Sequence, residues 1–281
     1  MGVRDQDCVR FLQAYLPRLG LKWAGYRKVR RTVCKRIGRR KRELGLSDLA
    51  AYGRLLEHSP EEMARLDAFC RIPISRFYRD RAVFDALGDT LLPDLAERAA
   101  MRGDREVQCW SAGCASGEEV YTLRLLWDLA PQPSHPNMRL AILGTDADEV
   151  MLKRAAAACY PGGSFKDVPA DWSERAFTPD NDTLCLRPEF RRDIVLRRED
   201  IRAQQPDGTF DLVLCRNLAF TYFAGDLQRR TLAAIERCLW PGGLLVLGAH
   251  ERLPAEAEAF VRESAALPIW RKPAKKKGGP R

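Results

Sequence analysis

The stretch that organises this chain reads Val107-Gln108-Cys109-Trp110-Ser111-Ala112-Gly113-Cys114-Ala115-Ser116-Gly117-Glu118-Glu119-Val120-Tyr121. An apolar run that suits a buried strand meets a turn of small residues, and apolar residues then recur at helical spacing. This order predicts a strand, a tight loop and a helix. Glycines let backbone N–H groups approach a ligand, and a helix N-terminus carries partial positive charge. We therefore expect a nucleotide-like cofactor here, with close packing alone as the alternative.

Alternating apolar runs and amphipathic segments follow this turn, which predicts an α/β fold with a doubly wound parallel sheet. The expected strands cover residues 140–143, 194–196, 210–215 and 244–247, and the expected helices cover 148–158 and 226–240. In such sheets ligands bind beyond the carboxyl ends of the strands, where Asp146, Asp200 and Asn217 fall. Polar residues at several strand ends favour a ligand site over simple packing.

Three parts of different composition follow one another along the chain. Residues 1–72 form a small helical domain, with helices expected at 7–16, at 47–56 with Ser47 as N-cap, and at 60–70 with Ser59 before Pro60. Residues 73–272 form the α/β domain, interrupted at about 160–192 by a small antiparallel β-unit. The basic tail, residues 273–281, is expected to be disordered.

The positive charge is localised, because twelve Lys/Arg and no acid lie in the basic block between Arg18 and Arg42, and six Lys/Arg and no acid lie between Arg271 and Arg281. Apolar residues at helical spacing predict a helix over residues 26–42 that packs one stripe, made of Tyr26, Val29, Val33 and Ile37. We expect its cationic faces to dock an acidic protein partner. A solvated surface without a partner is the alternative. The docking residues that we expect are Arg30, Arg31, Arg39 and Arg40.

Cysteine usage and hydropathy bound the setting. The nine cysteines are odd in number and include no C-x-x-C pair, so we expect reduced thiols in the cytoplasm and neither a disulfide framework nor a zinc or other metal site. No apolar run approaches the roughly 18–20 residues of a membrane span, and the first ten residues do not form a signal peptide. We expect a cytoplasmic monomer that does not insert into a membrane.

The residues of the turn favour a cationic cofactor. Asp146 is placed to accept hydrogen bonds from both ribose hydroxyls of a nucleoside. The third glycine of a dinucleotide motif is missing, and Glu118 and Glu119 would stand where a pyrophosphate needs neutral donors. Carboxylates suit the amino group and sulfonium of S-adenosylmethionine.

Over nearly its whole length the chain resembles the chemotaxis receptor methyltransferases, the CheR-type protein-glutamate O-methyltransferases. The resemblance is carried by Trp110-Ser111-Ala112-Gly113-Cys114-Ala115-Ser116-Gly117-Glu118-Glu119, Gly144-Thr145-Asp146-Ala147-Asp148, Phe210-Asp211-Leu212-Val213-Leu214-Cys215-Arg216-Asn217, Tyr222-Phe223 and Pro241-Gly242-Gly243. It implies a class I (Rossmann-like) S-adenosylmethionine-dependent methyltransferase with a helical N-terminal domain and an inserted β-subdomain. It also implies transfer of a methyl group to a glutamate of a chemoreceptor or related signalling protein, with S-adenosylhomocysteine as product.

Site residues follow from this resemblance. It implies that Glu118 receives the methionine ammonium, Asp146 the ribose and Asp200 the adenine region. The implied cofactor-binding set is Ser75, Arg79, Gly113, Ala115, Gly117, Glu118, Asp146, Asp200 and Asn217. The implied catalytic positions are Arg79, Asn217 and Tyr222.

Simpler structural roles are the alternatives for three residues at strand ends and turns. Asp200 also suits a helix N-cap, Tyr222 a packed aromatic and Arg216 a surface ion pair. The sequence alone does not decide between these roles and the functional ones.

The expected chemistry needs little more than positioning. A glutamate of ordinary pKa, about 4.3, is already ionised near neutral pH, so no strong general base is required. An arginine can clamp the carboxylate and an amide can orient it.

Departures from the family pattern at 71–75, 218–221 and 249–251 bear on the substrate. The rival functions are a methyltransferase for a small molecule or nucleic acid, and a cofactor-binding module without catalysis. Nucleic acid is disfavoured because the basic block lacks interleaved aromatic residues.

Overall fold

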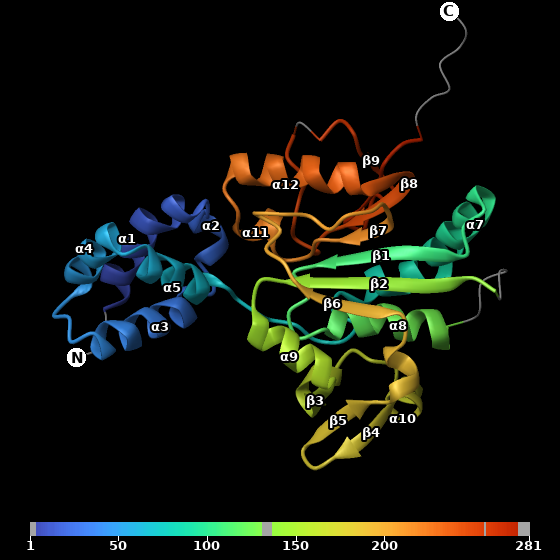
Figure 1. Cartoon of the computed structure of the whole chain (residues 1–281), viewed down its shortest axis with the longest axis horizontal. Coiled ribbons are helices and arrows are strands. Elements are labelled where there is room, and N and C mark those ends of the chain that lie inside the picture. The colour runs from blue at the N-terminus through green and yellow to red at the C-terminus, as the bar shows by residue number, and fades with distance from the viewer. Residues whose placement is uncertain (1–3, 131–136, 256, 275–281) are drawn as a thin grey trace, which may run out of the picture. The chain divides into compact units, whose positions relative to one another are not determined.

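The computed structural model describes residues 4–130, 137–255 and 257–274. It divides into two compact units (Figure 1). One comprises Met1–Pro73 together with Thr221–Gln228, and the other comprises Ile74–Phe220 and Arg229–Arg281. Among the described residues, no helix combines the length and the apolar character needed to cross a membrane. Disorder was predicted for the tail, residues 273–281. Of these, residues 275–281 lie outside the described part of the chain.

The first unit is helical. Its elements are α1 (Asp5–Tyr15), the 3-10 turn η1 (Leu16–Leu19), α2 (Trp23–Tyr26), α3 (Arg30–Glu43), α4 (Leu49–His58) and α5 (Pro60–Cys70). Helix α5 begins as predicted, because the Ser59 hydroxyl accepts the Glu62 N–H at 3.2 Å. Helix α4 is capped by Asp48, whose carboxylate accepts the Ala51 N–H at 2.8 Å, and not by Ser47.

The sequence predicted one continuous helix over the basic segment, and this prediction was wrong. Tyr26 ends the short helix α2, and α3 begins only at Arg30. The buried Tyr26 hydroxyl donates to the Cys70 carbonyl at 3.1 Å, and its ring lies 5.0 Å from that of Tyr222. These tertiary contacts determine the position of Tyr26. Val33 and Ile37, at helical spacing, form the buried face of α3 as predicted.

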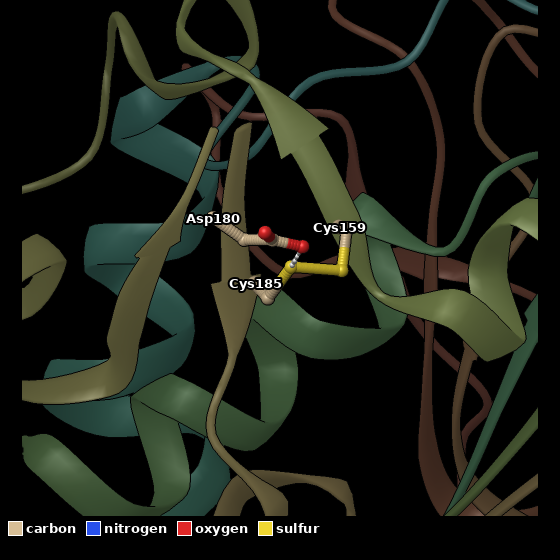
Figure 2. A group of neighbouring side chains, drawn as sticks. All are labelled: Cys159, Asp180 and Cys185. Carbon is tan, nitrogen blue, oxygen red and sulfur yellow. Dashed lines mark hydrogen bonds between the residues drawn. A yellow bond between two sulfur atoms is a disulfide. The ribbon is translucent and has the colours of Figure 1, made fainter. Parts of the chain in front are cut away.

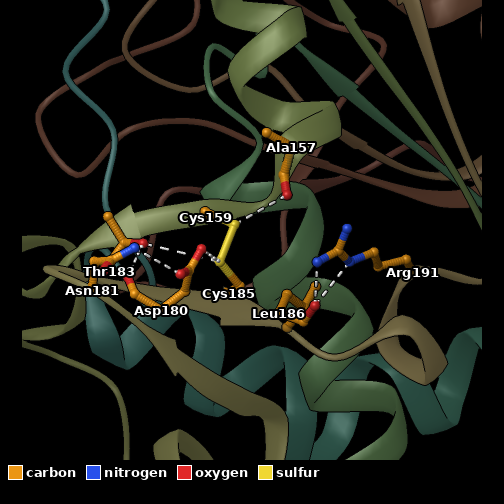
Figure 3. The surroundings of a disulfide bond; sticks show 8 residues. All are labelled: Ala157, Cys159, Asp180, Asn181, Thr183, Cys185, Leu186 and Arg191. Carbon is orange, nitrogen blue, oxygen red and sulfur yellow. Dashed lines mark hydrogen bonds between the residues drawn. A yellow bond between two sulfur atoms is a disulfide. The ribbon is translucent and has the colours of Figure 1, made fainter.

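The expectation of reduced cysteines without disulfides was wrong. Cys8–Cys34 joins α1 to α3, and Cys159–Cys185 joins two strands of the inserted subdomain (Figure 3). Each pair spans 26 residues of sequence, so neither forms a short motif that could be recognised. The free cysteines of the described chain are all buried: Cys70, Cys109, Cys114, Cys215 and Cys238.

The second unit is built on one large sheet. Its elements along the chain are α6 (Arg81–Ala86), the π-turn η2 (Leu87–Leu91), α7 (Leu92–Arg102), β1 (Glu106–Ala112), α8 (Glu118–Leu129), β2 (Arg139–Asp146), α9 (Glu149–Ala157), β6 (Ile194–Arg198), β7 (Phe210–Leu214), α11 (Ala219–Tyr222), α12 (Gly225–Cys238), β8 (Leu239–Val246), β9 (Val261–Arg262) and β10 (Ile269–Arg271). Residues of α11 and α12 divide between the two units.

The strand order is β6-β2-β1-β7-β8-β10-β9 (Figure 1). Strands β6, β2, β1, β7 and β8 are parallel, and β10 pairs antiparallel with β8 and β9. Every residue of β7 is buried, as expected for a parallel strand covered on both faces. The predicted fold class, a class I methyltransferase sheet of the α/β type, is confirmed, although β9 and β10 were not predicted.

The predicted antiparallel insertion is present. It contains β3 (Cys159–Pro161), η3 (Gly162–Phe165), α10 (Ala170–Ala176), β4 (Phe177–Asp180), β5 (Thr183–Leu186) and η4 (Pro188–Arg191), and its sheet has the order β3-β5-β4. Phe77 packs among its aromatic rings, 4.9 Å from Tyr160 and 5.1 Å from Phe165. The Phe77 N–H also donates to the Ser164 carbonyl at 3.0 Å. The insertion therefore anchors the segment that leads to Arg79.

Candidate active site

The glycine turn after β1 requires its glycines. Gly113 and Gly117 have φ angles of +76° and +88°, a region that glycine adopts without strain. A Cβ atom on Gly113 would lie 2.5 Å from Leu218 Cδ2, and one on Gly117 would lie 2.9 Å from Ala155 Cβ. The loop therefore packs too closely for a side chain at either position. Ala115, between them, has a φ angle of +47°.

Asp146 lies beside this turn, at the end of β2. Its Oδ2 accepts the Ala115 N–H and its Oδ1 accepts the Asp148 N–H, each at 2.8 Å. The side chain is only partly buried. Asp146 therefore orders the loop between β1 and α8 through two backbone donors.

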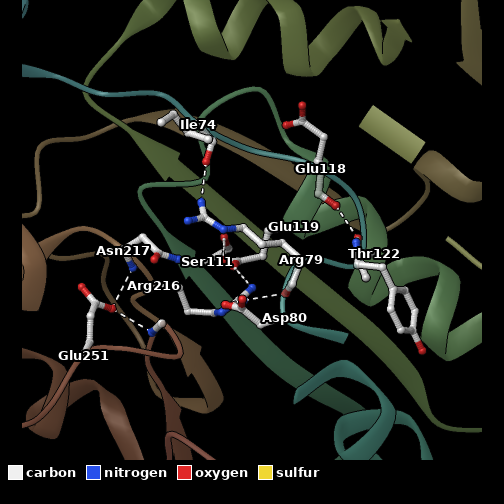
Figure 4. Close-up of polar contacts among 12 residues, drawn as sticks. Ile74, Arg79, Asp80, Ser111, Glu118, Glu119, Thr122, Arg216, Asn217 and Glu251 are labelled. Carbon is white, nitrogen blue, oxygen red and sulfur yellow. Dashed lines mark hydrogen bonds and ion pairs between the residues drawn. The ribbon is translucent and has the colours of Figure 1, made fainter. Parts of the chain in front are cut away.

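The two glutamates that open α8 point in different directions (Figure 4). The buried Glu118 carboxylate accepts the Ser116 hydroxyl at 2.9 Å. The carbonyl of Ser116 in turn accepts the hydroxyl of Tyr160 at 2.7 Å. Burial raises the pKa of Tyr160, and the charge of Glu118 adds to this effect. The Ser116 hydroxyl therefore holds the Glu118 carboxylate within its own loop.

Glu119 belongs to a separate network. Its Oε1 accepts the Ser111 hydroxyl at 2.7 Å, and its Oε2 accepts Nη1 of Arg216 at 2.8 Å. Nη2 of Arg216 donates to Asp80 Oδ2 at 2.7 Å and to the Arg79 carbonyl at 2.6 Å. The Arg216 side chain is 3% exposed, so the surface-ion-pair interpretation is wrong. Figure 4 shows this network joining the end of β7, helix α8 and the turn before α6.

Arg79 stands in that turn between two residues with left-handed backbone. Tyr78 and Asp80 have φ angles of +57° and +64°. The Tyr78 N–H donates to the Thr122 hydroxyl at 3.1 Å. Nη1 of Arg79 donates to the Ile74 carbonyl at 2.7 Å (Figure 4). The Arg79 guanidinium is therefore hydrogen-bonded to the segment that precedes it.

Asn217 follows Arg216 and also has a left-handed backbone, with φ at +55°. Its N–H and that of Gly248 both donate to Oε2 of Glu251, each at 2.7 Å. Glu251 is 7% exposed. The sequence did not predict a role for Glu251, which lies in the departure from the family pattern at residues 249–251. The only local feature that could have indicated this contact is an acidic residue three positions after Gly248.

Two further predicted cofactor residues lie in the same unit. Ser75 is partly buried in the segment before Arg79. The Asp200 carboxylate accepts the Arg202 N–H at 3.0 Å and pairs with the Arg202 guanidinium at 2.6 Å. Residues 201–203 form a turn and not a helix, so the helix N-cap interpretation of Asp200 is wrong.

Tyr222 belongs to the first unit, where its ring packs on Tyr26 and its carbonyl accepts the Lys22 N–H at 2.8 Å. This packing supports the structural alternative that the sequence left open. A catalytic role for Tyr222 remains a prediction.

The predicted docking residues differ in their surroundings. Arg31 and Arg39 are exposed, and Arg39 pairs with Glu43 of its own helix at 3.5 Å. Arg30 pairs with Asp5 at 3.0 Å, and Arg40, 19% exposed, pairs with Glu62 at 2.8 Å. Acids from α1 and α5 thus compensate two cations that appear uncompensated in the sequence. The exposed cations of the block are Arg18, Arg27, Lys28, Arg31, Lys35, Arg39 and Arg42.

One group of residues in the inserted subdomain has the composition of a metal site. Ligand atoms of Cys159, Asp180 and Cys185 lie within 4.8 Å of one another (Figure 2). Thiolates are the form of cysteine that binds metals, and both of these sulfurs are in a disulfide. In this state the group does not offer a metal site.

Comparisons with known proteins find similar sequences. Residues 74–267 match the family model described as CheR methyltransferase, SAM binding domain. The chain is 29% identical over 254 residues to a chemotaxis protein methyltransferase of Listeria monocytogenes, covering 89% of this chain and 91% of that protein. It is 35% identical over 239 residues to an uncharacterized 104.1 kDa protein of Rhodobacter capsulatus, covering 85% of this chain and only 25% of that protein.

A third relative is a probable biofilm formation methyltransferase, WspC, of Pseudomonas putida. The chain is 29% identical to it over 222 residues, covering 78% of this chain and 49% of that protein. The chain therefore spans half or less of two of these three relatives.

Proposed function

Because this chain belongs to the CheR methyltransferase family, we propose that it transfers a methyl group to a glutamate side-chain carboxylate of a signalling protein. It is a methyltransferase and its cofactor is S-adenosylmethionine. The cofactor supplies an electrophilic methyl group on a sulfonium. The residues of the chain have to bind that cofactor, hold the acceptor and exclude water.

The turn after β1 fits such a cofactor. Gly113 and Gly117 carry no side chain where the loop is tightest, and the Asp146 carboxylate lies at the carboxyl edge of the sheet, where it accepts the Ala115 and Asp148 N–H groups. Carboxylates at this edge suit a ligand whose amino group and sulfonium are both cationic. Within the set implied by the family pattern, we assign Glu118 to the ammonium, Asp146 to the ribose and Asp200 to the adenine. We assign Arg79 and Asn217 to the acceptor side.

The glutamate acceptor is supported by one observation above the others. Arg216 donates to the Arg79 carbonyl at 2.6 Å and directly precedes Asn217, so it links the backbones of the two residues that we assign to the acceptor. A guanidinium can clamp a carboxylate, and an amide can orient it. An acceptor glutamate with a pKa of about 4.3 is already ionised, so Arg79 and Asn217 need only position it.

The partner that we propose is an acidic protein, of the chemoreceptor kind, that docks on the exposed cations of α3. The named relatives serve chemotaxis in one case and biofilm formation in another. Both names are compatible with a signalling protein as acceptor.

The chemical identity of the product tests the proposal. The full chain is incubated with methyl-labelled S-adenosylmethionine and a cell extract, and labelled protein is treated with mild alkali. A carboxyl methyl ester releases labelled methanol, whereas N-methyl groups are stable. Alkali-stable label on protein would overturn the glutamate assignment. Label only in small molecules or nucleic acid would move the function to those acceptors.

A further inference from the structure

We propose that Arg216 is a positioning residue that presents Arg79 to the acceptor, and that Glu119 and Asp80 hold Arg216 in place for this purpose. This inference deepens the proposed function and rests on it, because it assigns Arg79 to the acceptor carboxylate. Arg216 itself is buried and acts through its neighbour.

The guanidinium of Arg216 is fixed on several sides. Glu119 accepts from Nη1, while Asp80 and the Arg79 carbonyl accept from Nη2, all at 2.8 Å or less. The ring of Phe84 lies 4.9 Å from its central carbon. A planar fork with fixed donors, stacked on an aromatic face, has few alternative orientations.

What Arg216 fixes is a strained turn. Tyr78 and Asp80, on either side of Arg79, both adopt positive φ, which is costly for residues with a side chain. Such backbone persists only where the surroundings determine it. The hydrogen bond to the Arg79 carbonyl and the ion pair to Asp80 provide this at the turn itself. The direction in which the Arg79 side chain leaves the backbone therefore depends on Arg216.

The ion pair also reaches the cofactor side of the site. Glu119 neighbours Glu118 at the start of α8, and Ser111 at the end of β1 donates to it at 2.7 Å. The side chains of Glu119 and Asp80 are 14% and 24% exposed, so both acids are shielded with Arg216. Removing one member would leave buried charge without its partner. One side chain thus couples the cofactor helix to the residue that we assign to the acceptor.

Lysine distinguishes positioning from bulk packing. It keeps the charge and most of the volume, but its single ammonium cannot reproduce the fork that reaches Glu119 and the Arg79 carbonyl together. Arg124 provides the matched control. Its side chain is 2% exposed, its Nη1 donates to the Leu140 carbonyl and its Nη2 pairs with Asp128 at 2.7 Å. It is a buried, paired arginine of the same unit, and its hydrogen bonds go to Leu140 and Asp128 and not to the partners of Arg216.

The test is a double-mutant cycle on the full chain. Arg216→Lys, Arg79→Lys and the double variant are compared for turnover of the labelled acceptor and for affinity for S-adenosylhomocysteine. We expect Arg216→Lys to lower kcat about tenfold or more, the scale of a misplaced catalytic group, with cofactor affinity changed by about threefold or less. In the Arg79→Lys background, Arg216→Lys should lower kcat very little further, because the residue through which Arg216 acts has already been replaced.

Additive losses in that cycle would overturn the proposal, as would a parallel loss of kcat, cofactor affinity and melting temperature. Arg124→Lys should give additive effects with Arg79→Lys. If Arg216→Lys does not fold, Glu119→Gln supplies the second route, since it weakens the same pair while keeping its shape. The cycle can be measured on whatever acceptor is labelled, so alkali-stable label would refute the proposed glutamate acceptor without deciding the role of Arg216.

Discussion

The carboxylate of Glu251 accepts the backbone N–H of Asn217 at 2.7 Å, from a position that is almost fully buried. The same oxygen accepts the Gly248 N–H. A Cβ atom on Gly248 would lie 2.8 Å from Asn217 Oδ1, so the two loops are in close contact. Glu251 therefore holds Asn217 in its left-handed conformation from behind the site.

Replacing Glu251 should loosen this contact. Glu251→Ala leaves two backbone N–H donors without their acceptor. This should lower the free energy of unfolding by about 1–3 kcal/mol for each unsatisfied donor. Turnover should fall as well, because Asn217 loses its anchor. Denaturant unfolding and kcat measure the two effects. The neighbouring His250 is exposed, and His250→Ala should change neither. If Glu251→Ala has the same free energy of unfolding and the same kcat as the wild type, other contacts hold the Asn217 loop.

Asp146→Ala should weaken binding of S-adenosylmethionine and S-adenosylhomocysteine. The variant loses the carboxylate that orders the Ala115 N–H and that we assign to the ribose. Calorimetric titration should show a loss of about 1.5–3 kcal/mol, the scale of hydrogen bonds to a charged group. Asp146→Asn keeps one acceptor oxygen and should lie between the two. Equal affinity in wild type and Asp146→Ala would remove the ribose assignment.

Asn217→Ala should reduce turnover much more than cofactor affinity, because we place its amide on the acceptor side. Loss of one hydrogen bond that acts in the transition state should exceed about tenfold in kcat. Steady-state kinetics on the labelled acceptor, with calorimetry for the cofactor, separate the two effects. A rate within about twofold of wild type would make Asn217 a structural residue.

Reversing the exposed cations of α3 should weaken acceptor binding. Arg31→Glu with Arg39→Glu should raise the KM for the protein acceptor and leave cofactor affinity unchanged. The KM of the wild type should rise with salt, since a Debye length of about 8 Å screens such a surface at physiological ionic strength. Arg30 and Arg40 are left intact because they pair with Asp5 and Glu62.

Arg175→Glu, an exposed charge reversal in α10, is compared with Arg31→Glu alone, because each single reversal lowers the net charge by the same amount. Its KM should match that of the wild type once overall charge is allowed for. Unchanged kinetics of the α3 variant at low and moderate salt would contradict a docking role.

The Arg40–Glu62 pair should make the first unit sensitive to acid. A hydrogen bond from Arg40 lowers the pKa of the Glu62 carboxyl from its ordinary value. Because the pKa of Glu62 is lower in the folded state than in the unfolded state, where it is near 4.5, the ionised carboxylate stabilises the fold at pH values above 4.5. This stabilisation is lost as the pH falls through the pKa of the folded state. Glu62→Gln should therefore cost stability at pH 7 and lose less on acidification than the wild type. Parallel pH profiles of the two melting temperatures would contradict this.

The sequence by itself determined the elements and the cofactor turn. The glycines at 113 and 117, the apolar runs that become β1, β2, β6, β7 and β8, and the Ser59-Pro60 start of α5 all depend on local periodicity or local backbone geometry. Such features are encoded within a few residues. They were enough to predict the parallel sheet, the inserted β-unit and the edge at which Asp146 and Asn217 lie.

Only the tertiary structure decided which polar groups are buried together. Arg216 meets Glu119 across 97 residues and Asp80 across 136, and Glu251 meets Asn217 across 34. The same holds for Cys8 with Cys34, and for Arg40 with Glu62. None of these pairs leaves a periodic signal, because a buried charge or thiol is matched by whatever the fold brings within hydrogen-bonding or bonding distance. The energetic cost of burying a charge without a partner selects these contacts, and that cost exists only once the chain has folded.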